Sequence, residues 1–321
     1  MQTHRSLDSL TQLTGPLHLA IGVFDGLHLG HQEVIRHAQR AADSHGGTVV
    51  VVTFDPHPIR VLRPAESPRL LTSTRHKEII LKRLGIHHLL EIPFDLGFAA
   101  LSAEEFVAAL ESHCRPLGSI SVGVDWAFGR GRTGNVTTLK QLGADHGFSV
   151  HGVPRVCIDN EPISSTRIRQ AVEAGDFTQA RSLLGRDYAV LGTVVQGRQI
   201  GRKIGFPTAN LAGLAEQLPP VGVYAVRASL NGEFLPGVAN LGYRPTVEQD
   251  ERVRLLEVHL IDFDQDIYGQ ELEVKFIERL REEVRLPSLD ALKEQIAKDT
   301  AKARKVLGIE IIPASVEVDE E

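Results

Sequence analysis

A change of hydrophobic periodicity near residues 183–188 is the feature that most limits how this chain can fold. Before that point, short apolar runs alternate with stretches of helical spacing, whereas beyond it the apolar residues alternate with period two. A chain of 321 residues also exceeds what one hydrophobic core usually organises. We therefore expect two domains of different fold class, residues 1–184 and residues 185–321.

The first half predicts an α/β domain. Its apolar runs are rich in β-branched residues and are bounded by Gly, Pro or Asp, which is typical of buried strands. These runs are 17–24, 48–54, 88–94 and 119–124. Helical spacing covers 31–43, 74–84 and 102–113. Ser102 and Glu105 form a capping box for the last helix. The alternation of strand and helix favours a parallel sheet covered on both faces.

The second half predicts antiparallel strands. Asn231-Gly232 lies between two alternating segments, which is a strong signal for a hairpin. Further strands are expected at 253–261 and 271–277, and an amphipathic helix at 288–305 with Ser288 as its N-cap. We expect a small antiparallel barrel or sandwich with one terminal helix.

Composition excludes several classes of protein. The net charge of -6 and the pI near 6.2 give no electrostatic reason to expect nucleic acid as a partner. Cys114 and Cys157 lie in no CxxC arrangement, so neither a zinc site nor a disulfide framework is predicted. No apolar run is long enough to cross a membrane, and no secretory leader is present, which predicts a soluble cytoplasmic protein. The acidic tail is interpreted as a frayed terminus.

The densest chemistry in the first half is GVFDGLHLGH, residues 22–31, at a strand-to-helix turn. Glycines let the backbone approach a ligand closely, and a helix N-terminus offers free N–H groups to phosphate. His28 and His31 are three residues apart, so both imidazoles can project toward one ligand. Metal binding is the alternative, and it lacks an obvious third and fourth ligand.

A second element, ISSTRIR at 163–169, stands at the start of another predicted helix. Its hydroxyls can cap that helix, or they can bind phosphate. Arg167 and Arg169 carry guanidinium forks that match phosphate oxygens. We expect the two elements to form a clamp around a triphosphate.

In the second half, the segment 192–211 carries four glycines, three basic residues and the run Phe-Pro-Thr-Ala-Asn. Glycine and basic residues alone would indicate an exposed basic hairpin. Thr208 and Asn210 are two residues apart, so in an extended segment their side-chain oxygens face the same way. Neutral oxygens together with phosphates suit Mg²⁺, which keeps several of its waters.

These motifs carry a resemblance to known families. GxFDGxHxGH followed by ISSTxIR resembles the nucleotidyltransferase motifs of the bacterial FAD synthetase family, and TFDPHP (53–58) and GVDWAFGRGRTG (123–134) resemble its intermediate blocks. GRxxGFPTANL resembles the flavokinase motif, and GVYAV, ANLGYRPT, LEVHLIDF and DIYGQELEVKFIERLREE follow in the family's order. The resemblance covers about Leu17 to Arg304. It implies a Rossmann-like nucleotidyltransferase domain followed by a β-barrel flavokinase domain with a terminal helix.

The resemblance implies roles in the first half. His28 and His31 would contact the α-phosphate and the leaving group, while Ser165, Thr166 and Arg169 would hold the β- and γ-phosphates. Residues implied at the two ATP sites are Gly22, Phe24, Asp25, Gly30, Asp125, Ser164, Ser165, Thr166, Gly197, Gly201, Arg202, Gly205, Phe206 and Pro207. Asp125 would lie near the nucleotide or its Mg²⁺.

A flavin ring needs flat or rigid walls, and the candidates are Phe54, Pro56, His57 and Phe128. Phe54 is equally consistent with a core strand residue. The family commonly has Phe where Trp126 stands here.

Glu257 is implied as the general base that activates the riboflavin hydroxyl in the second half. It alternates with apolar Leu256 and Val258, so it lies on the opposite strand face, which is ordinarily the solvent face. His259 shares that face and would orient the base or the flavin. Asn240 and Arg244 are further substrate contacts, and Arg244 could equally cap a turn. The family usually has Lys-Phe where Arg285-Leu286 stand.

The resulting prediction is an enzyme that uses ATP and Mg²⁺ to convert riboflavin to FMN and then FMN to FAD. One alternative is a monofunctional riboflavin kinase with a silent first domain. Another is a non-catalytic flavin or nucleotide sensor, which would not need His28, His31 and Glu257 together.

Enzymes of this family can form trimers or dimers of trimers. No apolar stripe in the sequence indicates an interface, so the sequence does not decide between a monomer and a homo-oligomer.

Overall fold

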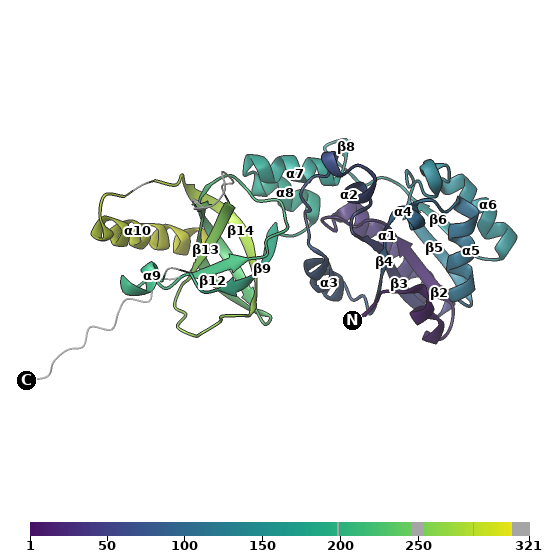
Figure 1. The fold of residues 1–321 in the computed structure, drawn as a ribbon, viewed down its shortest axis with the longest axis horizontal. Coiled ribbons are helices and arrows are strands. Elements are labelled where there is room, and N and C mark those ends of the chain that lie inside the picture. The colour runs from purple at the N-terminus through teal and green to yellow at the C-terminus, as the bar shows by residue number, and fades with distance from the viewer. Residues whose placement is uncertain (198, 245–252, 285, 310–321) are drawn as a thin grey trace, which may run out of the picture. The chain divides into compact units, whose positions relative to one another are not determined.

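The computed structural model describes residues 1–197, 199–244, 253–284 and 286–309 (Figure 1). The chain forms two compact units. The first comprises Met1–Arg169 and Ser182–Gly185, and the second comprises Gln170–Arg181 and Arg186–Glu321.

The first unit contains a six-stranded parallel sheet in the order β1-β4-β3-β2-β5-β6. Its strands are β1 (Gln2–His4), β2 (Leu17–Ile21), β3 (Thr48–Asp55), β4 (His88–Pro93), β5 (Leu117–Gly123) and β6 (Ser149–Val153). The predicted parallel sheet is confirmed. Its two edge strands were not predicted, because the three residues of β1 contain no apolar run and the positions of β6 are mostly only partly buried.

Helices and short turns connect these strands. They are η1 (Leu7–Gln12), α1 (Leu29–His45), α2 (Pro58–Leu62), η2 (Pro64–Glu66), α3 (Thr74–Arg83), α4 (Leu96–Ala99), α5 (Ala103–His113), η3 (Arg130–Arg132) and α6 (Val136–His146). The predicted capping box at Ser102 and Glu105 begins α5. A small hairpin, β7 (Cys157–Ile158) and β8 (Glu161–Pro162), precedes α7 (Ser165–Ala174) and α8 (Phe177–Leu184), and each of these two helices contributes residues to both units.

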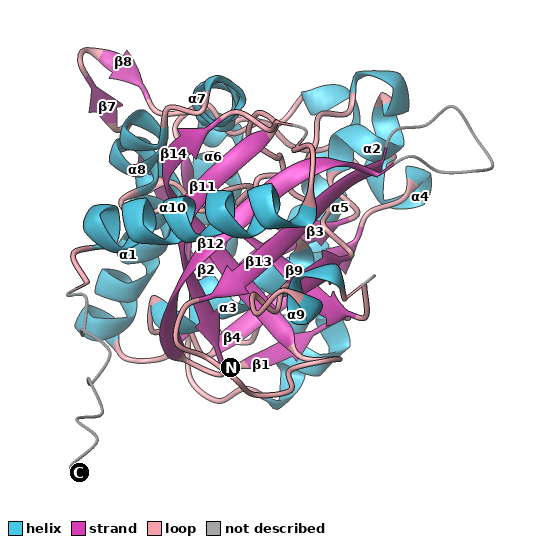
Figure 2. Cartoon of the chain, turned by 90° about the vertical axis from the view of Figure 1, so that its left-hand side faces the viewer, coloured by secondary structure: helices cyan, strands magenta, loops and turns pink. Residues whose placement is uncertain are grey.

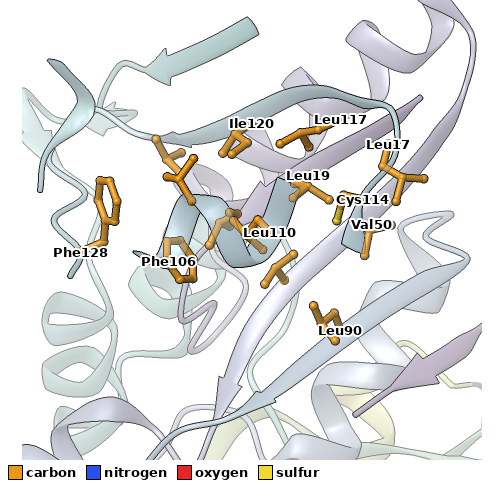
Figure 3. Packing of buried hydrophobic residues seen from close by; sticks show 14 of the residues in the cluster. Leu17, Leu19, Val50, Leu90, Phe106, Leu110, Cys114, Leu117, Ile120 and Phe128 are labelled. Carbon is orange, nitrogen blue, oxygen red and sulfur yellow. The ribbon is translucent and has the colours of Figure 1, made fainter. Parts of the chain in front are cut away.

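The strands of this sheet bury both faces, as parallel sheets do. Leu19 and Ile21 of β2 pack with Phe106 and Leu110 of α5, and Figure 3 shows Leu19 and Leu110 among the side chains of this core. Ala20, between them in sequence, packs on the other face against α1 and α3. The period-two alternation of a strand places successive residues on opposite faces, and helices cover each face.

The second unit is a closed antiparallel barrel in the order β10-β13-β12-β11-β14-β9. Its strands are β9 (Ala189–Val195), β10 (Ala209–Ala212), β11 (Gly222–Leu230), β12 (Glu233–Arg244), β13 (Val253–Leu260) and β14 (Glu271–Arg281). The hairpin at Asn231-Gly232 is confirmed, with both residues at positive φ, 51° and 92°. Closure of the sheet decides for a barrel and against a sandwich.

Two helices accompany the barrel, the short α9 (Ile200–Lys203) and the terminal α10 (Leu289–Leu307). Ser288 is the N-cap of α10, as predicted. The helix packs on β11, β12 and β14, and Figure 2 shows it lying across these strands. The guanidinium of Arg281 in β14 pairs with the buried carboxylate of Asp299 in α10, with an Nη2–Oδ2 distance of 2.8 Å. This bridge fixes the helix against the barrel wall.

Candidate active sites

The loop between β2 and α1 has an unusual backbone. Phe24, Gly26 and Leu27 have φ of 52°, 83° and 43°, in the left-handed region that residues other than glycine rarely adopt. Such conformations persist only where the surroundings enforce them, and they concentrate at functional sites. The loop is buried from Phe24 to His28. The predicted ligand-binding turn is therefore a rigid structure.

The two predicted histidines lie in contact at the start of α1. His28 is the N-cap of the helix, and its Nδ1 accepts a hydrogen bond from the backbone N–H of His31 at 3.3 Å. The two rings stack with centroids 3.6 Å apart. Gly30 has a steric role, because a Cβ there would lie 3.2 Å from the His28 ring. His28 and His31 thus place two imidazoles at the N-terminus of α1, where anions are favoured.

Asp25 and Arg169, both predicted at the nucleotide site, are bonded to each other. The Asp25 carboxylate forms an ion pair with Arg169 and accepts the Leu71 backbone N–H at 2.8 Å. The Arg169 Nε also donates to the carbonyl of Arg69 at 2.8 Å. Part of the Arg169 fork is thus used to fix the loop and is not directed at a ligand.

The start of α7 meets the same loop. The Ser165 hydroxyl donates to the backbone carbonyl of Asp25 at 2.9 Å, and the Ser164 hydroxyl caps the helix by accepting the Arg167 N–H at 3.3 Å. Thr166 is exposed. Arg167, in contrast, donates to backbone carbonyls at β8 and so holds the β7–β8 hairpin. The two predicted elements are adjacent, but Arg167 serves the hairpin.

A cavity of about 500 Å³ lies beside this loop. Its walls are largely aromatic and include Val23, Phe54, Phe94, Phe98, Phe106, Trp126 and Phe128. Trp126 stacks on Phe128 with centroids 4.5 Å apart, so the departure from the family's Phe retains a flat wall. Phe54 both belongs to the hydrophobic core and lines the cavity, so a core position does not exclude it from a ligand site.

The remaining predicted flavin contacts, Pro56 and His57, lie elsewhere. In their place, Pro58 and Leu62 line the cavity. His57 is the N-cap of α2, its Nδ1 accepts the Ile59 N–H at 3.2 Å, and burial lowers its pKa. The local turn that starts α2 therefore determines where His57 points.

Three wall residues were missed by sequence reasoning. Phe94 follows β4, Phe98 lies in α4 and Phe106 in α5, so they come together only through the tertiary fold. The available signal was the density of phenylalanine between residues 94 and 106.

Asp125 lies at the rim of the aromatic cavity. It is exposed and pairs with Arg155, whose Nη2 donates to Oδ1 at 2.8 Å. Hydrogen bonding from Arg155 lowers the pKa of Asp125. The carboxylate is therefore charged, and it shares a cavity with Phe128.

The second unit brings three predicted residues onto one rung of the barrel. Asn210 of β10 stands opposite Glu257 of β13, and Glu257 stands opposite Asn240 of β12. Side chains at paired positions on one face lie close together, with Cβ atoms about 5 Å apart. All three line a cavity of about 420 Å³. Leu256 and Val258 are fully buried on the other strand face, as the alternation predicted.

A second cavity, of about 330 Å³, adjoins this one. Gln199 and Thr208 line both cavities, so the two spaces adjoin at these residues. Arg202 and Pro207 line only the second cavity, whose lining also includes Asp266 and Tyr268. Two ligands could therefore meet beside Thr208.

The glycine-rich segment is shaped by close packing. A Cβ at Gly197 would overlap the Asn210 amide, and a Cβ at Gly201 would overlap the Phe206 carbonyl. Gly205 has φ of 87°. His259 Nδ1 lies 2.9 Å from the Pro207 carbonyl, and its ring meets the Phe206 ring edge-on. His259 thereby holds the segment that carries Thr208.

The wall contributed by α10 was not predicted from sequence. Leu292 and Ile296, one helical turn apart, line the larger cavity of this unit together with Asp299 and Arg281. The only sequence signal was the apolar stripe of the helix. The Arg244 side chain and Arg285 lie outside the described residues, so their predicted contacts stay predictions.

The donor set near Thr208 fits Mg²⁺ better than a metal bound by protein alone. Among the described parts of the chain, no group of three His, Cys, Asp or Glu side chains could hold a metal ion. Thr208 and Asn210, whose side chains carry neutral oxygens, line one cavity, and the Asn210 amide packs directly on Gly197. Such a site depends on phosphates for its remaining ligands.

Comparison with known proteins places both units in named families. Residues 11–167 match the family model described as FAD synthetase, and residues 184–307 match that described as riboflavin kinase. A bifunctional riboflavin kinase/FMN adenylyltransferase of Haemophilus influenzae is 40% identical over 307 residues, covering 94% of this chain and 99% of that protein. Relatives of the same description are 41% identical in Escherichia coli K12, covering 91% and 93%, and 38% identical in Bacillus subtilis, covering 89% and 90%.

A Streptococcus pneumoniae crystal structure described as a macrolide-efflux protein shares the fold. It aligns with a TM-score of 0.78 at 32% identity and covers 95% of this chain and 99% of that one. In the residues described here, no helix is long and apolar enough to cross a membrane. The three enzymes above are more similar to this chain in sequence.

Proposed function

This chain belongs to the family of bifunctional riboflavin kinases and FMN adenylyltransferases, and from this premise we propose how its two units divide the chemistry. The protein phosphorylates riboflavin to FMN with ATP, and it then transfers an adenylyl group from a second ATP to FMN, giving FAD and pyrophosphate. We assign the kinase to the barrel unit and adenylyl transfer to the α/β unit.

The observation that carries the kinase assignment is the rung of Asn210, Glu257 and Asn240. Riboflavin would occupy the cavity containing Glu257, and ATP the adjoining cavity, so that they meet beside Thr208. The 5′-hydroxyl of riboflavin is a weak nucleophile. Glu257 takes its proton as the oxygen bonds to the γ-phosphorus and ADP departs. The flanking amides orient the hydroxyl and the carboxylate.

Mg²⁺ fits Thr208 and Asn210, which would hold it together with the phosphates of ATP. When bound, it neutralises charge on the phosphates. The protein's own contribution is to keep these two oxygens in place, through Gly197 packing on Asn210 and His259 holding the Pro207 carbonyl.

Adenylyl transfer needs no protein nucleophile, because the FMN phosphate is already charged. The aromatic cavity suits the flavin ring, and the stacked pair of His28 and His31 suits the α-phosphate and departing pyrophosphate. A phosphate oxygen of FMN attacks the α-phosphorus of ATP, and the bond from that phosphorus to the departing pyrophosphate breaks. Catalysis then depends on alignment and on stabilising charge at phosphorus. Ser165 and Arg169 fix the loop on which that alignment depends.

We place the domain boundary between residues 184 and 185, where the periodicity of the sequence changes. Since both reactions consume ATP, we also propose that the protein works in the cytoplasm.

Incubating the purified chain with riboflavin, ATP and Mg²⁺ and separating the flavins over time tests the proposal. FMN should appear first and FAD second, and FMN supplied directly should give FAD. Formation of FMN without FAD would indicate a monofunctional riboflavin kinase. Binding of riboflavin without any conversion would indicate a non-catalytic sensor.

A further inference from the structure

Lys77 of α3 is a buried cation close to the adenylyl-transfer loop, and the mechanism above does not use it. Only 7% of its surface is exposed. Its Nζ donates to the backbone carbonyl of Val23 at 3.0 Å and to the Thr53 hydroxyl at 3.1 Å. Within the described ranges, no carboxylate forms an ion pair with this ammonium group.

Burying a charge with only neutral partners destabilises a fold. The two oxygens do not need the lysine, because the Thr53 hydroxyl itself donates to the Val23 carbonyl at 2.9 Å. An apolar side chain of the same length would leave these groups paired with each other. The lysine is therefore a cost to stability that the local hydrogen bonding does not explain.

Val23 connects the two halves of the adenylyl-transfer site. Val23 lines the aromatic cavity. The next residue, Phe24, has φ of 52° and places its ring 5.3 Å from that of His31, edge to face. A shift of the Val23 carbonyl would thus move both the flavin wall and the histidine pair.

Resting on the proposed function of this unit, we propose that Lys77 is a positioning residue for adenylyl transfer. The Thr53 hydroxyl keeps the Val23 carbonyl paired, and the Lys77 ammonium group is the second donor that fixes the direction of this carbonyl. It thereby keeps the strained loop in the conformation that aligns the flavin cavity with His28 and His31. Its positive charge lies against Val23, in the loop that we propose receives the phosphates.

The charges around Lys77 give the expected dependence on pH. Burial lowers the pKa of Lys77 from 10.5, and the carboxylates of Asp25, Glu91 and Asp55 oppose that change. The charge of Lys77 in turn helps to lower the pKa of His57. Lys77 therefore loses its charge at a lower pH than a free lysine, and the rate of FAD formation should fall as the pH rises through that value. Folding stability should increase over the same range, because the penalty for the buried charge disappears.

The experiment compares Lys77→Met, Lys77→Arg and Lys82→Met, the last an exposed lysine on the same helix. FAD formation from FMN and FMN formation from riboflavin are measured on each purified variant, with pH profiles and thermal midpoints. We expect Lys77→Met to lower kcat/KM for FAD formation at least about tenfold, since small misplacements of reacting groups have large effects. Riboflavin phosphorylation should stay within about twofold of wild type, and the thermal midpoint should hold or rise. Lys82→Met should resemble wild type.

Lys77→Arg separates charge from geometry. Arginine stays charged at every accessible pH, so any activity that it restores should lack the alkaline decline seen in wild type. Thr53→Val tests the same network from its other side if the larger guanidinium cannot be accommodated. It removes one acceptor of the ammonium group and also the second donor to the Val23 carbonyl, while keeping side-chain volume. It too should slow FAD formation selectively.

Normal FAD formation by Lys77→Met would overturn the inference. So would a loss of FAD formation that accompanies a lower thermal midpoint with an unchanged pH profile, which would indicate a structural role. If wild-type protein phosphorylates riboflavin but makes no FAD, the proposed function of the first unit fails instead.

Discussion

The α/β unit and the barrel both act on ATP, but they build their sites in different ways. In the α/β unit, the chemistry lies where strands end and helices begin, on a loop with left-handed residues held by Asp25, Arg169 and Lys77. In the barrel, it lies within strands, where Asn210, Glu257 and Asn240 share one rung. The first site depends on what holds its backbone, whereas the second depends on register. Substitutions that affect one reaction and spare the other test this contrast.

Glu257→Gln should have the largest effect. The amide occupies the same place on the rung but cannot accept the hydroxyl proton, so riboflavin phosphorylation should fall about 1,000-fold. FAD formation from supplied FMN should be unchanged. Chromatographic assays of each half-reaction measure this, and equal loss of both activities would contradict the division of labour.

His28→Asn should lower FAD formation from FMN about 100-fold and leave phosphorylation intact. Asparagine is a good N-cap, so the variant removes the imidazole while retaining an acceptor for the start of α1. Far-ultraviolet circular dichroism checks that the helix persists. Activity close to wild type would show that the stacked pair is not used in the reaction.

Gly30→Ala should lower FAD formation about tenfold, because the added methyl would press on the His28 ring and displace it. Gly197→Ala is the matched change in the barrel, where the methyl would overlap the Asn210 amide. It should slow phosphorylation and raise the Mg²⁺ concentration needed for half-maximal rate. Steady-state kinetics of both reactions are measured for each variant. Slower phosphorylation in Gly30→Ala, or slower FAD formation in Gly197→Ala, would contradict the contrast between the two sites.

Glu91→Gln should have the smallest effect, and we expect it mainly on stability. Burial raises the pKa of Glu91 above its ordinary 4.5, so the folded state keeps the proton to a higher pH than the unfolded state does. Stability therefore falls as the pH rises from the pKa of Glu91 in the unfolded state to its higher pKa in the folded state. It stays lower above that range. The variant should melt about 2–4 °C higher than wild type at pH 8, with a smaller difference near pH 4.5. A lower melting temperature at pH 8 would mean that the carboxylate stabilises the fold.

Much of the fold follows from local patterns. The hairpin at Asn231-Gly232, the cap at Ser288 and the alternation of β2 are each set by neighbouring residues, and each was predicted. The edge strands β1 and β6 were missed, because an edge strand needs little apolar surface of its own. Its position depends on the strand beside it.

By itself, the sequence determined the fold class, the two families and the residues that stand close together in a motif, such as His28 with His31 and Thr208 with Asn210. Their proximity follows from helix and strand geometry. The tertiary structure alone decided that Phe94, Phe98 and Phe106 share a cavity, that Arg281 holds Asp299, and that Lys77 holds Val23. These contacts join residues from different elements, and no local spacing encodes which side chains the packing of sheet and helix will bring together.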